Sequence, residues 1–423
     1  MINRAELEKE YEGYKALGLK LDMTRGKPAK EQLDITEPLL GVLSSKEDCI
    51  VDGVDYRNYG ILDGIPAAKR IFSDILGVPT EQIIVGGNSS LNLMYDTMAR
   101  AMLSGVVGSD KPWSKYDQIS FLCPVPGYDR HFAICEYFGI NMIKVPMTSE
   151  GPDMNMVEKL VKEDDSIKGI WCVPKYANPN GITYSKETVR RFASLKPKAK
   201  DFRVFWDNAY AIHDLTDTPD ELPDILSIAA EYGNENMFFE FTSTSKISFP
   251  GSGLAAIASS VENIKAITKQ LSYQTIGYDK LNQLRHAKLF PDKESLINHM
   301  KLHRAIIKPK FDAVINEFDN RKLYNLEGVH YTRPNGGYFI SLDLPNGCAK
   351  RLVQLASEAG LALTAAGATF PYGKDPNDSN IRIAPTFPSL DTIKTAAKVL
   401  ACCIQLTVAE YEEKFASGAD YQK

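Results

Sequence analysis

The 423-residue sequence lacks the marks of several protein classes. Its seven cysteines are an odd number, and none lies in a CxxC or Cys/His spacing that would hold a metal ion. We therefore expect no metal site, and reduced, mostly buried cysteines in a cytoplasmic protein. No block of basic residues occurs and the formal net charge is -5, which argues against a sequence-independent nucleic-acid surface.

Long apolar runs are also missing. No window approaches about 18 uninterrupted apolar residues, the length that a membrane-spanning helix needs. The first residues, MINRAELEKEYEGYKALGLKLDM, are charged and helical in pattern, unlike a signal peptide. No repeat or low-complexity segment occurs. We expect a protein that contacts neither membrane nor nucleic acid.

The chain is long enough for more than one core. Single cores stop growing at roughly 250 to 300 residues, so 423 residues predict two domains. We expect an N-terminal segment, residues 1–50, that joins the smaller domain, and a large α/β domain over residues 51–297. Residues 298–423 form the remaining part, a small C-terminal α+β domain.

Strands and helices alternate through the predicted large domain. The strands are apolar on both faces, which indicates an α/β fold with a mostly parallel central sheet flanked by helices. Ligands bind beyond the carboxyl ends of such strands. That rule places five short segments on one rim of the sheet: residues 86–90, 126–128, 178–181, 207–210 and 243–246.

Lys246 is the central candidate for chemistry on this rim. It follows the apolar run Met237 to Phe241 and a hydroxyl-rich turn, and a second apolar run comes after it. A lysine held between buried strands needs a shifted pKa or a partner. It could form an imine with a carbonyl substrate or with pyridoxal phosphate, or it could serve in a surface or ion-pair role.

Two other rim positions suit the same cofactor. Asp207 follows a buried strand, where a carboxylate could keep a pyridine nitrogen protonated; the alternative is a helix-capping or loop carboxylate. The glycines and small hydroxylic residues at 86–90 open a helix, where free N-H groups and the helix dipole attract an anion. Here the alternative is an ordinary helix cap.

Six motifs in a fixed order carry a resemblance to a known family. They are NSS (Asn88 to Ser90), PGY (Pro126 to Tyr128), NPNG (Asn178 to Gly181), DNAY (Asp207 to Tyr210), STSK (Ser243 to Lys246) and IRIA (Ile381 to Ala384). The set resembles the pyridoxal-phosphate-dependent class I aminotransferases of fold type I, most closely their divergent aspartate aminotransferase-like branch. The resemblance runs from about Leu21 to the C-terminal helix and implies the fold of these transferases.

The resemblance assigns catalytic and ring-binding roles to five residues. Lys246 would form the imine with pyridoxal 5'-phosphate and, once released, carry the proton between substrate and cofactor. Asp207 would pair with the pyridine nitrogen. Asn178 and Tyr210 would donate to the ring 3-oxygen, and Tyr128 would stack on the ring face.

The same resemblance implies a phosphate site and a substrate site. The phosphate would be bound by Asn88, Ser89, Ser90 and Ser243, and Ser245 would also contact the cofactor. Arg382 would bind the substrate carboxylate, since a guanidinium matches a carboxylate through two hydrogen bonds. Gly26 would cover the substrate side of the cofactor, and Asn178 would contact the substrate as well.

Tyr59 resembles the tyrosine that reaches the phosphate of the neighbouring subunit, which implies a homodimer with shared active sites. The sequence departs from the family pattern at one place, where Gly253 stands at the position of a phosphate-binding arginine. A dicarboxylic substrate would need a second cation, and the candidates are Arg25, Lys27, Lys280 and Arg285. Arg25 adjoins Gly26.

The predicted function is amino-group transfer. We expect a ping-pong aminotransferase that acts on an L-amino acid of the aspartate or glutamate type and on a 2-oxo acid such as 2-oxoglutarate. Another enzyme on the same scaffold, a β-lyase or decarboxylase, is the first alternative, because fold and cofactor do not fix which bond at Cα breaks. A non-catalytic binding module is the second.

Overall fold

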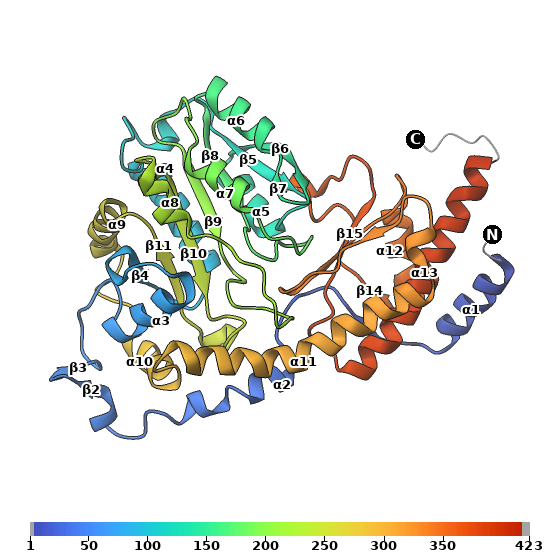
Figure 1. The fold of residues 1–423 in the computed structure, drawn as a ribbon, viewed down its shortest axis with the longest axis horizontal. Coiled ribbons are helices and arrows are strands. Elements are labelled where there is room, and N and C mark those ends of the chain that lie inside the picture. The colour runs from blue at the N-terminus through green and yellow to red at the C-terminus, as the bar shows by residue number, and fades with distance from the viewer. Residues whose placement is uncertain (1–3, 417–423) are drawn as a thin grey trace.

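A computed structural model describes residues 4–416. Its largest feature is an eight-stranded sheet that lies between layers of helices (Figure 1). From one edge to the other, the strands are β4 (Ile83–Val85), β11 (Ala255–Ala258), β10 (Phe238–Ser243), β9 (Arg203–Asp207), β8 (Ile167–Cys172), β5 (Ser120–Val125), β6 (Asn141–Thr148) and β7 (Gly151–Pro152).

The sheet is mostly parallel. Strands β10, β9, β8, β5 and β6 pair in parallel, whereas β11 runs antiparallel to both β10 and β4, and β7 runs antiparallel to β6. The predicted α/β fold is therefore confirmed. Because parallel strands end at a common edge, the ends of β8, β9 and β10 open on one side of the sheet.

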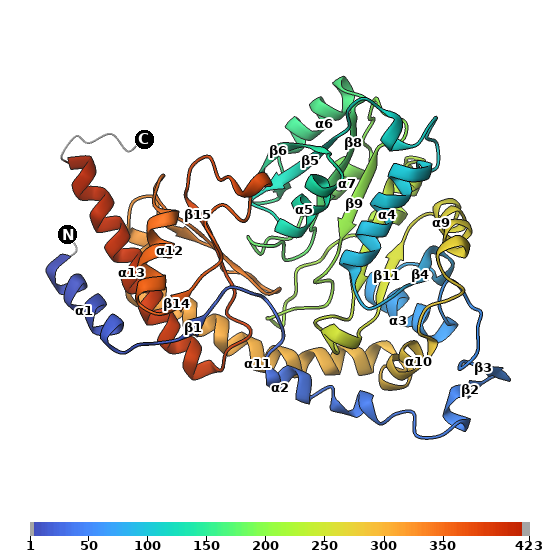
Figure 2. The same cartoon turned by 180° about the vertical axis from the view of Figure 1, so that it is seen from behind.

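Helices cover both faces of this sheet, so its strands are buried on both sides. Neighbouring residues of β9 illustrate this: Trp206 packs into one core and Phe205 into the other. Figures 1 and 2 show the two helical layers. One comprises α3 (Pro66–Leu76), α6 (Met154–Glu163), α7 (Lys186–Ala193), α8 (Ile225–Glu231) and α10 (Lys280–Leu289); the other comprises α4 (Ser90–Ser104), α5 (Asp129–Tyr137) and α9 (Val261–Gln274).

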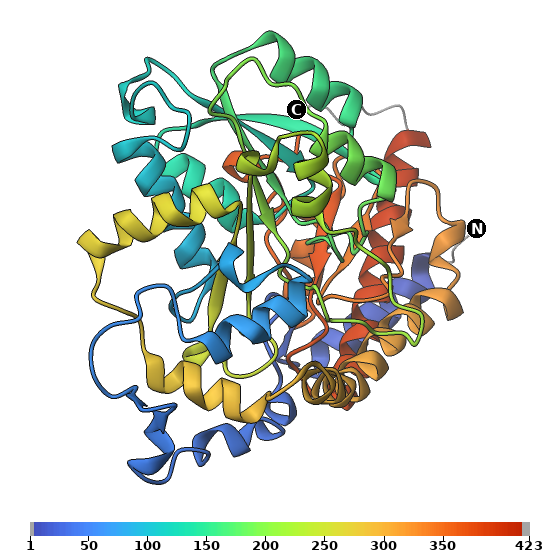
Figure 3. The same ribbon diagram turned by 60° about the vertical axis from the view of Figure 1, so that its left-hand side comes forward.

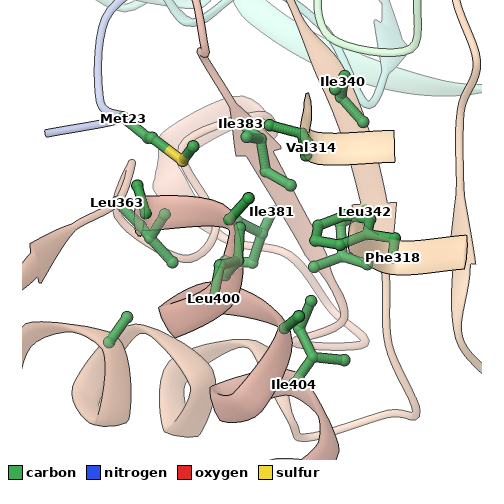
Figure 4. Close-up of a cluster of buried hydrophobic side chains, with 14 of the residues drawn as sticks. Met23, Val314, Phe318, Ile340, Leu342, Leu363, Ile381, Ile383, Leu400 and Ile404 are labelled. Atoms are coloured by element: carbon green, nitrogen blue, oxygen red, sulfur yellow. The ribbon is translucent and has the colours of Figure 1, made fainter. Parts of the chain in front are cut away.

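A third hydrophobic core belongs to a smaller α+β unit. Its three-stranded antiparallel sheet consists of β12 (His330–Tyr331), β13 (Ile340–Asp343) and β15 (Asn380–Ile383), and β1 (Leu21–Asp22) pairs in parallel with β14 (Leu361–Ala362). Helices α1 (Arg4–Ala16), α12 (Ala349–Glu358) and α13 (Leu390–Ala416) complete it. Figure 4 shows side chains from the sheet, from α13 and from residue Met23 meeting in this core.

One long helix, α11 (Lys293–Asn320), joins the two units (Figure 1). Its residues Leu296 and Met300 pack into the core of the large unit, whereas Ile307 and the apolar residues after it pack into the small one. The change of core thus falls between Met300 and Ile307, inside the helix. No break in the chain marks it.

The N-terminal segment divides between the two units. Leu7, Tyr11, Leu21 and Met23 contribute to the small core. After them the chain passes α2 (Lys30–Asp34) beside α11 and reaches the short hairpin of β2 (Ile50–Val51) and β3 (Val54–Asp55). Figure 3 shows this blue part of the chain running below the large sheet, next to the gold helix α10.

Helix α13 satisfies the length and hydropathy criteria for a membrane span over Leu390–Lys414. However, 72% of its most apolar 18-residue window is buried within the protein. A core helix of a folded domain shows the same combination, so this is weak evidence for a span. All seven cysteines are buried, as the sequence predicted for most of them.

Candidate active site

A cavity of about 700 Å³ lies where the ends of the parallel strands face the small unit. The large unit contributes Asp207 at the end of β9, and Ser243, Ser245 and Lys246 at and after the end of β10. The small unit contributes Phe339 and Arg382, among others. The strand-end rule thus brings residues together that lie far apart in the sequence.

Asp207 is fixed through one carboxylate oxygen. Its Oδ2 lies 3.0 Å from Nε2 of His131, on α5, and both side chains are buried. The His131 ring stacks on Trp171 at a centroid distance of 4.4 Å and an angle of 10°, which sets the orientation of the imidazole. The other oxygen, Oδ1, is buried and has no hydrogen-bond partner. A buried acceptor left open is costly unless a ligand supplies a donor.

Lys246 lies among aromatic rings. Its Nζ is 5.0 Å from the ring centre of Tyr210 and 5.6 Å from that of Tyr338. Burial lowers the pKa of Lys246 below its ordinary value, and the attraction of Asp207 opposes this only in part. The side chain therefore loses its proton more readily than a surface lysine does.

The start of α4 offers hydrogen-bond donors. Ser89 is the N-cap of this helix, but its side chain makes no capping hydrogen bond to the first turn. Ser89 and Ser90 line the cavity together with Ser243 and Ser245, whose hydroxyls are 3.0 Å apart. An anion at this place would meet uncapped N-H groups, serine hydroxyls and the positive end of the helix dipole.

Arg382 lies at the wall that the small unit contributes. Its Nη1 donates to Oδ1 of Asp129 at 2.9 Å and to Oδ1 of Asn178 at 3.4 Å, and its guanidinium lies 4.9 Å from the Phe339 ring centre. Its Nε is buried without a partner. Gly26 packs so closely against the same Phe339 ring that a Cβ at position 26 would lie 2.5 Å from a ring carbon.

The cavity gathers most of the residues that the sequence predicted for the site. Those that line it are Arg25, Gly26, Ser89, Ser90, Tyr128, Asn178, Asp207, Tyr210, Ser243, Ser245, Lys246 and Arg382. Lys27 lines it as well, with Nζ 3.8 Å from the centre of the Phe387 ring.

The cavity leaves out two residues of the predicted site and two candidate cations. Asn88 is exposed and donates its amide N-H to the carbonyl oxygen of Pro250 at 3.2 Å. Tyr59 is 82% exposed and does not line the cavity of its own chain. Lys280 and Arg285, on α10, also lie outside the lining.

Sequence reasoning missed several residues of the site. His131, Asp129 and Arg130 follow directly on the PGY motif, so three polar residues at the start of a helix were the available signal. Arg130 is exposed and lines the cavity. Tyr338 and Phe339 carried no local signal, because only the packing of the small unit brings them near Lys246.

The backbone around Gly253 explains why no arginine fits easily there. A Cβ at this position would lie 3.0 Å from the carbonyl oxygen of Phe249 and 3.0 Å from Oγ1 of Thr244. Asn282 holds the same loop by donating to the carbonyl oxygens of Ser252 and Gly253. A larger residue would require the two close neighbours, Phe249 and Thr244, to move by a few tenths of an ångström.

Known proteins resemble the chain over nearly its whole length. The profile of a family described as aspartate amino-transferase matches residues 2–415. A putative aminotransferase of Mycolicibacterium smegmatis is 47% identical over 95% of this chain and 94% of its own. The crystal structure of an aspartate transaminase from Corynebacterium glutamicum has a TM-score of 0.93 and 45% identity, with 96% of each chain covered.

A more distant structure shares the fold. It is an α-aminoadipate aminotransferase from Thermus thermophilus, complexed with N-(5'-phosphopyridoxyl)-L-leucine, and it has a TM-score of 0.74 and 20% identity. The match covers 92% of this chain and 93% of the Thermus thermophilus chain. At that identity the likeness concerns the fold alone.

Proposed function

The chain belongs to the aspartate aminotransferase family of fold type I, and from that membership we propose that its cavity binds pyridoxal phosphate and transfers the amino group of a dicarboxylic amino acid. The family makes the chain an aminotransferase, so the β-lyase, decarboxylase and binding-module alternatives lose their support. The cofactor, the substrate, the ping-pong order and the dimer are the parts that we propose.

The open oxygen of Asp207 carries the proposal for the cofactor. Oδ1 is buried without a partner while His131 holds Oδ2. A protonated pyridine nitrogen is a donor that would satisfy Oδ1 and add an ion pair in a low-dielectric site. When bound, pyridoxal phosphate supplies an electron sink for the electrons left at the substrate Cα.

Lys246 is the residue that we assign to proton movement. Its lowered pKa raises the fraction of neutral amine, which a group must be to accept a proton from Cα. The rings of Tyr210 and Tyr338 limit the positions that Nζ can take. Asn178 and Tyr210, which also line the cavity, would donate to the ring oxygen of the cofactor.

A dicarboxylic substrate is supported by Arg382 together with a second arginine of the cavity. Arg382 faces the first carboxylate, which would replace Asp129 as the partner of the guanidinium. Arg25 and Arg130 also line the cavity, are exposed, and form no ion pair within residues 4–416. Either can meet the second carboxylate of aspartate or glutamate. We assign that role first to Arg130, because it adjoins Asp129, the partner of Arg382.

A homodimer would account for Tyr59. This side chain lies in the segment before α3, is 82% exposed and does not line the cavity of its own chain. Donation of its hydroxyl to the phosphate in a second copy would supply a contact that the Gly253 loop lacks. The proposed dimer therefore shares its sites.

The test is a titration of the purified protein with pyridoxal phosphate, followed by aspartate. We expect aspartate to convert the cofactor to its amino form, 2-oxoglutarate to reverse the change, and steady-state rates to give parallel double-reciprocal lines. The Lys246→Ala protein should lose turnover. Release of pyruvate or CO2 without the amino form would contradict the proposal, and so would full turnover by Lys246→Ala.

The second carboxylate is tested by Arg130→Gln and Arg25→Gln. A lost hydrogen bond to a charged group costs about 1.5 to 3 kcal/mol, so we expect Arg130→Gln to lower kcat/KM for aspartate roughly 10- to 100-fold and that for alanine little. Arg333→Gln, which removes an arginine paired with Asp319 on the small unit, is the control. Equal losses for aspartate and alanine in both cavity variants would contradict the assignment.

A further inference from the structure

Two histidines of α11 hold the main chain next to Lys246. The carbonyl oxygen of Ile247 lies 2.8 Å from Nε2 of His299 and 2.9 Å from Nε2 of His303. Both imidazoles are buried, and their Nε2 atoms are 3.0 Å apart. A carbonyl oxygen has two lone pairs, so it can accept from both rings. The peptide group between Ile247 and Ser248, one residue beyond Lys246, is thus held from the side of α11.

Gln32, on α2, sets the proton position of His303. The main-chain N-H of Ala29 donates to Oε1 of Gln32 at 3.0 Å, which fixes which end of the amide is the donor. Nε2 of Gln32 then donates to Nδ1 of His303 at 2.9 Å. Because Nδ1 is an acceptor, the proton of the neutral ring is on Nε2, where it points to the carbonyl of Ile247.

The same amide also reaches the other side of Lys246. Nε2 of Gln32 donates to the hydroxyl of Tyr338 at 2.8 Å. The Tyr338 ring lies 5.6 Å from Nζ of Lys246 and stacks on Tyr210 at a centroid distance of 6.0 Å and an angle of 19°. The Gln32 side chain therefore supports two neighbours of Lys246: the carbonyl group of Ile247, through His303, and the Tyr338 ring beside the amine.

The network is closed to water and uncharged. Gln32 is 0% exposed and His303 is 1% exposed. A second proton on His303 would place Nδ1-H against the N-H of Gln32, so the geometry itself opposes the charged ring. Burial, with a smaller contribution from His299, lowers the pKa of His303 to about 3. The hydrogen bonds that Gln32 and His303 make have defined directions, which makes them suited to positioning.

We propose that Gln32 and His303 are positioning residues for Lys246, which fix the carbonyl group of the next residue, Ile247, and the Tyr338 ring beside the amine. They act through other groups and do not touch the reacting atoms. The inference rests on the proposed role of Lys246. It also gives the N-terminal segment a part in the reaction, because Gln32 joins the large unit, α11 and the small unit at one point.

The first test compares His303→Leu with His303→Gln. Leucine removes the N-H that holds Ile247, and misplacing a reacting group by about 1 Å can cost up to about 100-fold in rate. We expect His303→Leu to lower kcat by roughly ten-fold or more at nearly unchanged KM. It should also shift the pH midpoint at which the absorption band of bound pyridoxal phosphate changes. Glutamine keeps an N-H near the position of Nε2, so His303→Gln should recover most of kcat and the original midpoint.

Two further variants complete the design. Gln32→Leu, which breaks both hydrogen bonds of the amide, should reproduce the kcat loss and the shifted midpoint, and it serves if His303→Leu does not fold. His330→Leu removes an exposed imidazole on β12 and should leave both readouts unchanged.

The inference and the proposed function can fail separately. Wild-type kcat and midpoint in folded, cofactor-loaded His303→Leu or Gln32→Leu would overturn the positioning role, as would equal loss in His303→Leu and His303→Gln. Those results leave the proposed function standing if Lys246→Ala is inactive. Full turnover by Lys246→Ala would instead overturn the proposed function.

Discussion

Imidazoles make many of the hydrogen bonds around Lys246. His131 holds Asp207, His299 and His303 hold Ile247, and His286 contacts the hydroxyl of Ser248 at 2.8 Å. Burial lowers the pKa values of His286, His299 and His303, so these three rings are neutral near pH 7. A neutral ring offers one donor and one acceptor in fixed directions, and it leaves the electrostatic balance between Lys246 and Asp207 undisturbed.

These buried rings should make the fold sensitive to acid, and His286 allows the effect to be measured. Burial lowers its pKa from 6.5 to about 4, so between these values the unfolded chain binds more protons than the folded chain. Stability therefore falls as the pH falls through this window, by about 2 kcal/mol at pH 5 from this group. His286→Gln should be less stable than wild type near pH 7.5 by about 1 kcal/mol, and this gap should close or reverse by pH 5.

Urea unfolding of the apoprotein at several pH values measures this gap. His330→Gln is the matched control, since it removes an exposed imidazole from the same chain. A gap between His286→Gln and wild type that stays constant from pH 7.5 to 5 would show that His286 is not buried as a neutral ring.

The sequence could predict a site residue where its neighbours along the chain indicate its place in the fold. Asp207 ends one strand of the large sheet and Lys246 follows another, so the alternation of strands and helices in the sequence predicts that both lie on one edge. The contacts of His131 and Gln32 were not predictable, because their partners lie 76 and 271 residues away and only tertiary packing brings them together. Asn88 belonged to a motif, yet the backbone turns its side chain toward Pro250. The roles carried by the family resemblance stay predictions.

At the scale of elements, most strands and helices followed from apolar patterns, but α11 did not. The predicted boundary between residues 297 and 298 lies inside this helix, which contributes to the core of the large unit and to that of the small one. The apolar spacing of a helix cannot tell which core each turn meets. The pairing of β1 with β14 was equally hard to predict from the sequence, because each strand has only two residues and the two strands lie far apart in the chain.

A glycine turn holds that connection together. Gly360 follows α12 with φ at +82°, and a Cβ there would lie 2.1 Å from the carbonyl oxygen of Leu19. Gly77 follows α3 with φ at +79°, but no atom lies within 4 Å of its Cβ position. The positive φ disfavours a side chain at both positions. Only at Gly360 would an added Cβ also clash with the backbone.

The pair gives a matched prediction for stability. Gly77→Ala should cost about 1 kcal/mol, the price of a left-handed alanine. Gly360→Ala should cost about 3 kcal/mol or more, because β1 must move away from α12. Urea unfolding of both apoproteins, followed by circular dichroism, measures the difference. Equal destabilisation by the two substitutions would mean that the segment carrying Leu19 gives way freely.

At the scale of the whole molecule, the two units meet at the cavity and both termini of the described chain lie on the small unit (Figure 1). The proposed substrate would touch Arg382 from the small unit and Lys246 from the large one. The hydrogen bonds of Gln32 cross the same junction. A dimer would add a third contributor, since Tyr59 is exposed on the large unit's own surface.

Mixing two damaged subunits tests this shared site. Tyr59→Ala should weaken the binding of pyridoxal phosphate about ten-fold or more, because it removes a hydrogen bond to a charged group, and Lys246→Ala should be inactive. If Tyr59 acts in the partner's site, a mixed dimer contains one site with both native residues. Random exchange of equal amounts then restores about a quarter of the native sites.

Mixing Lys246→Ala with Asp207→Ala is the control: both residues line the cavity of one chain, so no mixed dimer has an intact site. Recovery in the first mixture alone supports the shared site, whereas no recovery despite exchange, or a monomer by light scattering, would contradict it.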